Sequence, residues 1–159
     1  MMKPVTYLIR HGETEWNRDK RIQGWNDSPL TETGIDQART IAGILKREIG
    51  PAAEIELYCS PLGRARKTAE IICDELGWDY SACRFENAIR ELNTGRWDGL
   101  TFDQVREAFP EDLDRFQTDS WHNRPPGGES YAMLARRISA WLESISHSAT
   151  IVAVSHGIA

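Results

Sequence analysis

Two histidines in this sequence each stand one residue beyond a short apolar run and directly before a glycine. The first is His11 in Arg10-His11-Gly12, and the second is His156 in Ser155-His156-Gly157. A neutral imidazole nitrogen can attack phosphorus in line and form a phosphohistidine, which divides one difficult transfer into two easier steps. The pair therefore indicates phosphoryl transfer through a covalent intermediate on His11, provided that the fold brings the two ends together.

The residues around these histidines suit a phosphate anion. Arg10 and Arg64 each carry a planar guanidinium that matches phosphate oxygens, and Arg64 lies on the first turn of a predicted helix, where anions are favoured. A protonated His156 would donate to a phosphoryl oxygen in the transition state. We interpret Gly12 as a position without a side chain where the backbone passes close to a ligand. The alternative to a phosphate-binding role is that Arg64 is a solvated helix residue and His156 a structural residue of the core.

A glutamate is the predicted proton donor and acceptor. A carboxyl beside a phosphate has a raised pKa, so it can protonate the leaving oxygen and then activate water against the phosphohistidine. Glu91 is the first choice, while Glu129 is also suited to organising its loop and capping the last helix. The competitors for the catalytic role are Glu13, Glu86 and Glu129.

Short apolar runs alternate with amphipathic patterns along the chain. The runs predict strands buried on both faces, and the patterns, with apolar residues three or four apart, predict helices. The predicted strands are 5–9, 55–59 and 150–154, and the predicted helices are 35–45, 62–76 and 131–145. This order predicts one α/β domain over 1–159, a three-layer α/β/α sandwich around a mainly parallel sheet. Ligands bind beyond the carboxyl ends of such strands, which is where the arginines and histidines stand.

The segment 92–128 interrupts this alternation. It is rich in glycine and proline around two short helical stretches, 102–109 and 111–121. We expect it to form a lid or specificity wall over one edge of the sheet. The adjacent arginines Arg136 and Arg137 lie in the last predicted helix, and we expect them to face solvent.

The composition limits the range of partners. The chain has 159 residues, of which 40% are hydrophobic and 27% charged, with a formal net charge of −5. We therefore expect no nucleic-acid partner and no membrane partner. Neither a signal peptide nor zinc-binding spacing is visible, so we expect a cytoplasmic protein with reduced core cysteines at 59, 73 and 83.

The motifs together resemble the histidine phosphatase superfamily, which includes the cofactor-dependent phosphoglycerate mutases and related phosphatases. The segments that carry the resemblance run in the family's order from residue 5 to the last residue; they are LIRHGET at 8–14, QG at 23–24, DSPLT at 27–31, SPLGRA at 60–65, REL at 90–92, GES at 128–130 and VSHG at 154–157. The resemblance implies a phosphohistidine on His11 and no metal or other cofactor. The implied phosphate pocket comprises Arg10, Arg64 and His156, with Asn17, Gln23 and Gly24 as secondary contacts and Glu91 as the acid and base.

One departure concerns the end of the chain. Family members usually continue into another helix after Ala159, and a final strand covered on one side would leave apolar surface exposed. The chain is then a shortened piece, or the ordered part of a longer protein, or another chain covers this face, for example in a homodimer. These alternatives stay open.

The predicted activity is hydrolysis of a small phosphorylated metabolite. The wall between Glu91 and Glu129 is shorter than in the mutases that the chain resembles, and the arginines in it are isolated, so water should reach the phosphohistidine. The alternatives are a phosphoglycerate mutase and an inactive phosphate-binding or interaction module.

Overall fold

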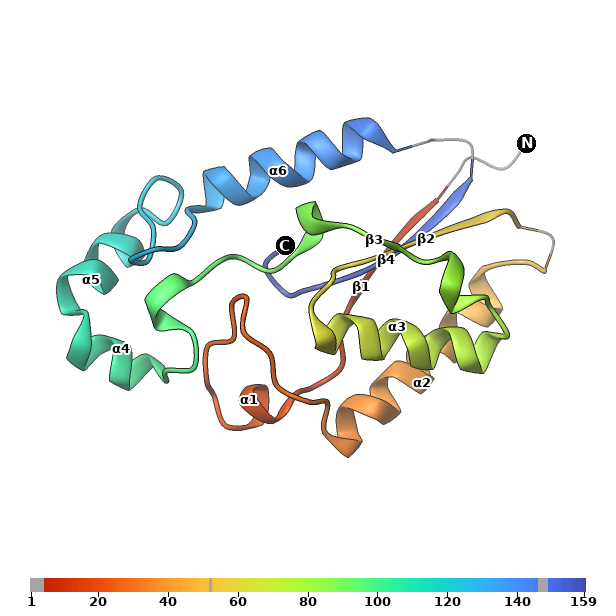
Figure 1. The fold of residues 1–159 in the computed structure, drawn as a ribbon, viewed down its shortest axis with the longest axis horizontal. Coiled ribbons are helices and arrows are strands. Elements are labelled where there is room, and N and C mark those ends of the chain that lie inside the picture. Colours follow the sequence, from red (N-terminus) through yellow and green to blue (C-terminus); the bar gives the residue numbers. More distant parts are fainter. Residues whose placement is uncertain (1–4, 52, 146–148) are drawn as a thin grey trace.

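The computed structural model of the chain describes residues 5–51, 53–145 and 149–159 (Figure 1). Its sheet has four strands, β1 (Thr6–Arg10), β2 (Ile55–Cys59), β3 (Arg84–Phe85) and β4 (Thr150–Ser155). Their order is β1-β4-β2-β3, and each neighbouring pair is parallel. The three predicted strands are confirmed. β3 was not predicted, because its two residues are too few to form a recognisable pattern.

Six α-helices and three short 3-10 helices complete the described part of the chain. The three long helices are found where the apolar spacing predicts them, and side chains of Thr31 and Ser130 cap two of them by accepting from backbone N–H groups. The α-helices are α1 (Glu15–Arg18), α2 (Glu32–Glu48), α3 (Gly63–Leu76), α4 (Phe102–Ala108), α5 (Pro110–Thr118) and α6 (Tyr131–Ser144). The 3-10 helices are η1 (Tyr80–Ala82), η2 (Asn87–Ile89) and η3 (Gly95–Trp97).

The helices cover both faces of the sheet, with α2 and α3 on one side and α6 on the other (Figure 1). Alternate residues of β4 divide between the two sides: Val152 and Val154 pack with α2 and α3, whereas Ile151 and Ala153 pack with Trp141 of α6. This alternation follows from the two-residue period of a strand. The predicted three-layer α/β/α architecture is confirmed.

The expected exposed apolar surface is present, but it does not lie on the last strand. β4 occupies a central position between β1 and β2, so its residues from Ile151 to Ser155 are all buried. The exposed apolar surface belongs instead to β1 at the sheet edge, where Leu8 is 70% exposed. Coverage by α6 decides this, because Trp141 packs on Ile151 and Ala153 of β4, whereas Leu8, in register with Ala153 on the same face, is left exposed.

The glycine- and proline-rich segment builds a small core of its own. Trp97, Val105 and Leu113 are buried against one another, and α4 and α5 lie at one end of the molecule, away from the strands (Figure 1). The second helix of this segment, α5, ends at Thr118, three residues earlier than predicted. Within the described residues no helix has the length and apolar character needed to cross a membrane.

Candidate active site

The carboxyl ends of β1, β2 and β4 converge. Arg10 is in register with Ser155, and the backbone N–H of His11 donates to the Ser155 carbonyl at 3.0 Å. On the other side of β4, the N–H of Ser60 donates to the Val154 carbonyl at 2.9 Å. The polar residues that follow the three strands are therefore adjacent in space, as the sequence predicts.

The imidazole of His11 is held in one tautomer. Its Nδ1 lies 2.8 Å from the Gly12 carbonyl oxygen, which can only accept, so Nδ1 carries the proton. Nε2 is then unprotonated, and its lone pair accepts a hydrogen bond from Nε of Arg64 at 3.2 Å. A neutral imidazole with an unprotonated Nε2 is the form required of a nucleophile.

Arg64 is fixed from several directions and is only 2% exposed. Its Nη2 donates to the Gly24 carbonyl at 2.8 Å, and its Nη1 donates to the Asn26 carbonyl at 2.7 Å and to Asp27 Oδ1 at 3.0 Å. Asp27 also accepts from the backbone N–H groups of Gly63 and Arg64 at the start of α3. The solvated-arginine alternative for Arg64 is wrong.

The surroundings keep His11 neutral. Burial is the main cause that lowers its pKa to about 4, and the positive charges of Arg64 and Arg10 act in the same direction. The hydrogen bond to Gly12 acts in the opposite direction but is outweighed. At neutral pH the nitrogen lone pair of His11 is therefore available for attack.

His156 lies beside His11, with the ring centroids 5.1 Å apart. Its Nε2 is 2.7 Å from Oγ of Ser60, while Nδ1 is buried and has no hydrogen-bond partner among the described residues. A buried polar atom of this kind is costly unless a ligand satisfies it. Burial, with help from Arg64, lowers the pKa of His156 to about 2, so the side chain is neutral at neutral pH.

Arg10 completes the cluster from the end of β1. It is exposed, and its guanidinium lies over the turn at Gly157, where an added Cβ would be 3.2 Å from Arg10 Nε. The backbone turn after His156 therefore leaves room for the Arg10 side chain. Arg10, His11, Arg64 and His156 together form a compact group of cations and imidazoles suited to a phosphate dianion.

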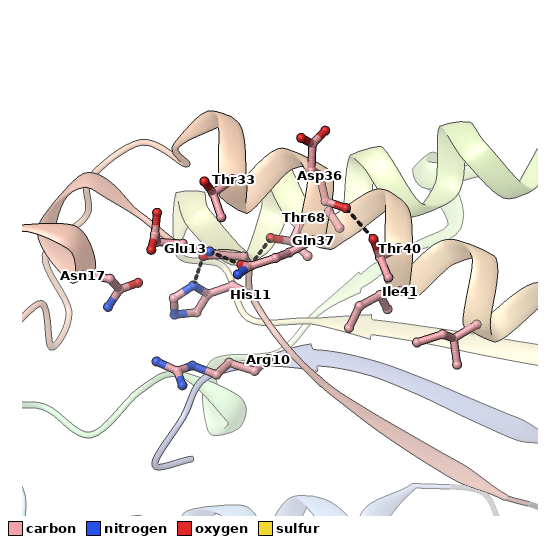
Figure 2. Close-up of a pocket in the computed structure, with 13 residues that line it drawn as sticks. Arg10, His11, Glu13, Asn17, Thr33, Asp36, Gln37, Thr40, Ile41 and Thr68 are labelled. Atoms are coloured by element: carbon pink, nitrogen blue, oxygen red, sulfur yellow. Dashed lines mark hydrogen bonds between the residues drawn. The ribbon is translucent and has the colours of Figure 1, made fainter.

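A cavity of about 760 Å³ opens beside His11. Arg10, His11 and Asn17 gather at one end of it, and Ile41 of α2 lies toward the other end (Figure 2). Asn17 has a second task, because its side chain accepts from the Thr14 backbone N–H in the capping box of α1.

Gly12 lines the cavity, and a second constraint also excludes a side chain there. An added Cβ there would lie 2.2 Å from the Gly34 carbonyl oxygen, and one at Gly34 would lie 2.1 Å from the Glu13 carbonyl oxygen. Gly12 is thus required by the close approach of two backbone segments, which brings the start of α2 against the loop after His11. The sequence shows two glycines but not that they face each other.

The two other secondary contacts, Gln23 and Gly24, lie behind Arg64 and do not line the cavity. The carbonyl of Gly24 accepts from Arg64, and the buried Gln23 amide oxygen accepts from the Ser28 hydroxyl at 3.2 Å. Gln23 and Gly24 therefore belong to the loop that fixes Arg64.

Glu91 follows η2, and it does not line the cavity beside His11. Its carbonyl oxygen accepts from Nε1 of Trp25 at 2.9 Å and from Nη2 of Arg137 at 2.7 Å, and its carboxylate accepts from the N–H of Leu92 at 2.8 Å. Trp25 belongs to the loop that holds Arg64, so Glu91 is tied through that loop to the cluster of Arg10, His11, Arg64 and His156.

The three other glutamates considered for the acid and base role, Glu13, Glu86 and Glu129, differ in position and in hydrogen-bond partners. The Glu86 carboxylate accepts from the Ala88 N–H, and Glu129 is paired with Arg137. Glu13 lines the cavity and accepts from the Thr31 hydroxyl at 2.7 Å. The expectation that Arg137 faces solvent is wrong, because its side chain is 19% exposed and ion-paired, whereas Arg136 is exposed as predicted.

Sequence reasoning missed three residues with clear structural tasks, Asp27, Trp25 and Arg137. Asp27 stands in the quoted 27–31 segment, but only its contact with Arg64 identifies its task.

Among the described residues, no three His, Cys, Asp or Glu side chains gather closely enough to hold a metal ion. The described cysteines 59, 73 and 83 are buried and free, as predicted.

Comparison with known proteins gives consistent matches along nearly the whole chain. The family model described as histidine phosphatase superfamily (branch 1) matches residues 6–159. A curated relative from Escherichia coli O1:K1, called probable phosphoglycerate mutase GpmB, is 40% identical over 156 residues, covering 96% of this chain and 69% of that protein.

Two solved structures illustrate the structural similarity. YhfR of Bacillus stearothermophilus is 35% identical with a TM-score of 0.83, over 96% of this chain and 74% of that chain. The alpha-ribazole phosphatase from Shigella flexneri is 27% identical with a TM-score of 0.84, over 95% of this chain and 73% of that chain.

Proposed function

The chain belongs to the histidine phosphatase superfamily, and we propose that it hydrolyses a small phosphorylated metabolite through a phosphohistidine on His11. The observation that carries the proposal is the state of His11. Its Nδ1 proton is engaged by Gly12, its Nε2 is unprotonated, and the Nε2 lone pair accepts a hydrogen bond from Nε of Arg64 at 3.2 Å. A phosphoryl group at this position would meet a neutral nucleophile inside a cationic pocket.

The first step forms a bond from Nε2 of His11 to phosphorus while the bond to the leaving oxygen breaks. Arg10 and Arg64 neutralise the phosphoryl oxygens, and Nδ1 of His156, which has no hydrogen-bond partner among the described residues, donates to one of these oxygens. The leaving oxygen takes a proton from Glu91. Arginines thereby fill the charge-neutralising role that Mg²⁺ has in other phosphoryl-transfer sites.

The second step returns the enzyme to its starting state. Glu91, now a carboxylate, takes a proton from water as the water oxygen attacks phosphorus, and the bond from phosphorus to Nε2 breaks. Inorganic phosphate leaves, and His11 is again neutral. The cavity of about 760 Å³ beside His11 would accommodate the organic part of a small phosphomonoester.

Phosphoenzyme trapping tests the nucleophile. Brief exposure to a radiolabelled phosphoryl donor should label the protein with an acid-labile, base-stable phosphate, and His11→Asn should abolish both labelling and phosphate release from a panel of phosphomonoesters. The panel should include an alpha-ribazole phosphate, because one relative is named as a phosphatase for it. Labelling that persists in His11→Asn would refute the assignment. Phosphate binding without label or turnover would favour the inactive phosphate-binding module.

A phosphoglycerate mutase is the second candidate, favoured by the name of the relative that is 40% identical. A mutase needs cations for the substrate carboxylate as well as for the phosphate. The adjacent arginines on α6 are unsuited, because Arg136 is exposed and Arg137 is paired with Glu129. We therefore expect phosphate release to exceed interconversion of 3- and 2-phosphoglycerate, as measured by an enolase-coupled assay. Faster mutase turnover would reverse this choice.

A further inference from the structure

Arg137 on α6 donates hydrogen bonds to two backbone carbonyls, one at Ala88 and one at Glu91. Its Nη1 donates to the Ala88 carbonyl, and its Nη2 donates to the Glu91 carbonyl at 2.7 Å. The same guanidinium binds Glu129 in a bidentate pair, with Nε to Oε1 and Nη2 to Oε2, each at 3.0 Å. A planar fork with several fixed donors is needed to make all these bonds at once.

Glu129 extends this arrangement to the other side of Glu91. Its Oε2 accepts from the backbone N–H of Asn93 at 2.9 Å, and its own N–H donates to the Asn93 carbonyl at 2.8 Å. The pair is largely shielded from water, with side-chain exposures of 19% for Arg137 and 13% for Glu129. Removing one partner of a shielded pair leaves an uncompensated charge and is therefore strongly destabilising locally.

A second contact links this arrangement to the phosphate-binding cluster. Nε1 of Trp25 donates to the same Glu91 carbonyl at 2.9 Å, and the guanidinium of Arg90 lies 3.7 Å from the centre of the Trp25 ring. The residues on either side of Trp25, Gly24 and Asn26, present their carbonyls to Arg64. The backbone of Glu91 is thus fixed relative to Arg64, which contacts His11.

We propose that the Arg137–Glu129 pair is a positioning device that holds the Glu91 carboxyl for proton transfer at the phosphate site. This proposal rests on the proposed function, in which Glu91 is the acid and base. Neither member of the pair contacts the reacting atoms; each acts through the backbone from 88 to 93. Proton transfer is sensitive to displacement of the acid, so loosening this backbone impairs the step without removing the carboxyl.

The leaving group reports whether Arg137 acts through Glu91. The p-nitrophenolate leaving group hardly needs a proton, whereas the alkoxide of glycerol phosphate does. Arg137→Met should lower kcat for glycerol phosphate by about 10²-fold, within the usual contribution of general acid catalysis, and kcat for p-nitrophenyl phosphate by less than about 5-fold. Arg137→Lys should recover little, because an ammonium cannot form the bidentate pair together with both carbonyl bonds. Arg136→Met, next to it on the exposed side of α6, is the matched control and should match wild type.

The double variant Glu91→Gln/Arg137→Met separates positioning from general damage. If Arg137 acts through Glu91, the double variant should be no slower with glycerol phosphate than Glu91→Gln alone. Additive losses, or equal losses of Arg137→Met with both substrates, would overturn the proposal. Equal losses of Glu91→Gln itself with both substrates would instead refute the acid role and with it the functional part of this inference.

Backbone hydrogen exchange tests the holding contacts independently of turnover. Peptides that cover 88–93 should exchange faster in Arg137→Met than in wild type and Arg136→Met, because the Asn93 N–H depends on Glu129 and the Glu91 carbonyl depends on Arg137. Peptides from β4 should be unchanged. Unchanged exchange at 88–93 would show that the pair does not hold this segment, whatever the activity of the variants.

Discussion

Nε of Arg64 lies 3.2 Å from Nε2 of His11, so a permanent cation donates to the nitrogen that we propose attacks phosphorus. A protonated imidazole could not accept this bond. The contact therefore favours the unprotonated nucleophile, and it places positive charge where the phosphoryl oxygens would lie.

Arg64→Lys should lower kcat by about 10²-fold or more, comparable with the loss of one preorganised donor in an oxyanion site. A lysine keeps the charge but cannot contact His11, Gly24, Asn26 and Asp27 at once. The measurement is steady-state phosphate release. Arg66→Lys is the control, because Arg66 is exposed and its guanidinium lies 4.7 Å from the Phe85 ring centre. Near-normal activity of Arg64→Lys would show that charge alone suffices.

The free energy of unfolding of the ligand-free protein should fall as the pH is lowered below about 6.5. The folded-state pKa values of His11 and His156 are about 4 and about 2, below the ordinary value of 6.5. Between these values and 6.5, both histidines are protonated in the unfolded chain and neutral in the folded protein. The stabilisation is complete above the unfolded pKa and is lost as the pH falls toward the folded values. Between pH 7.5 and 5.5 the loss should be about 1.4 kcal/mol for each histidine.

Urea unfolding at the two pH values measures this loss. His156→Gln, which cannot titrate, should show a smaller decrease than wild type. Inorganic phosphate should also reduce the decrease, since a bound anion favours the protonated imidazoles. A decrease that is the same in wild type and His156→Gln would mean that His156 is not a source of the pH dependence.

Glu91→Gln should lower kcat for glycerol phosphate by ~10²–10⁴-fold and affect p-nitrophenyl phosphate much less, because only the alkoxide needs a proton. Glu13→Gln is the informative comparison, because Glu13 lines the cavity beside His11 while its carboxylate accepts from Thr31. Parallel assays of both variants with both substrates decide between them. A leaving-group effect in Glu13→Gln but not in Glu91→Gln would transfer the acid role to Glu13.

Chelation should leave the activity unchanged. In the proposed mechanism Arg10 and Arg64 neutralise the phosphoryl oxygens, so no divalent cation is needed for charge compensation. Phosphate release is compared before and after dialysis against EDTA, and again after Mg²⁺, Mn²⁺ or Zn²⁺ is added. An activity that disappears with EDTA and returns with one metal would contradict the mechanism.

The main features of the fold could be predicted from the sequence because they depend on local patterns. Apolar runs of strand length, amphipathic spacing and caps such as Thr31 and Ser130 are properties of neighbouring residues. β3 was missed because its two residues form no pattern. The exposure of Leu8 on β1 was also missed, because it depends on which strands α6 covers, and a strand's own residues do not show where a distant helix packs.

The sequence by itself determined which chemistry is available, since His11, Arg64 and His156 each follow a strand and the carboxyl ends of parallel strands share one edge of a sheet. Only the tertiary structure decided how these groups act on one another. Burial depresses the pKa of both histidines, and a carbonyl fixes the tautomer of His11. The Arg137 side chain donates to the Glu91 carbonyl instead of facing solvent. Such properties arise from partners far apart in the chain, because electric fields and hydrogen bonds depend on distances in space and not on separations in sequence.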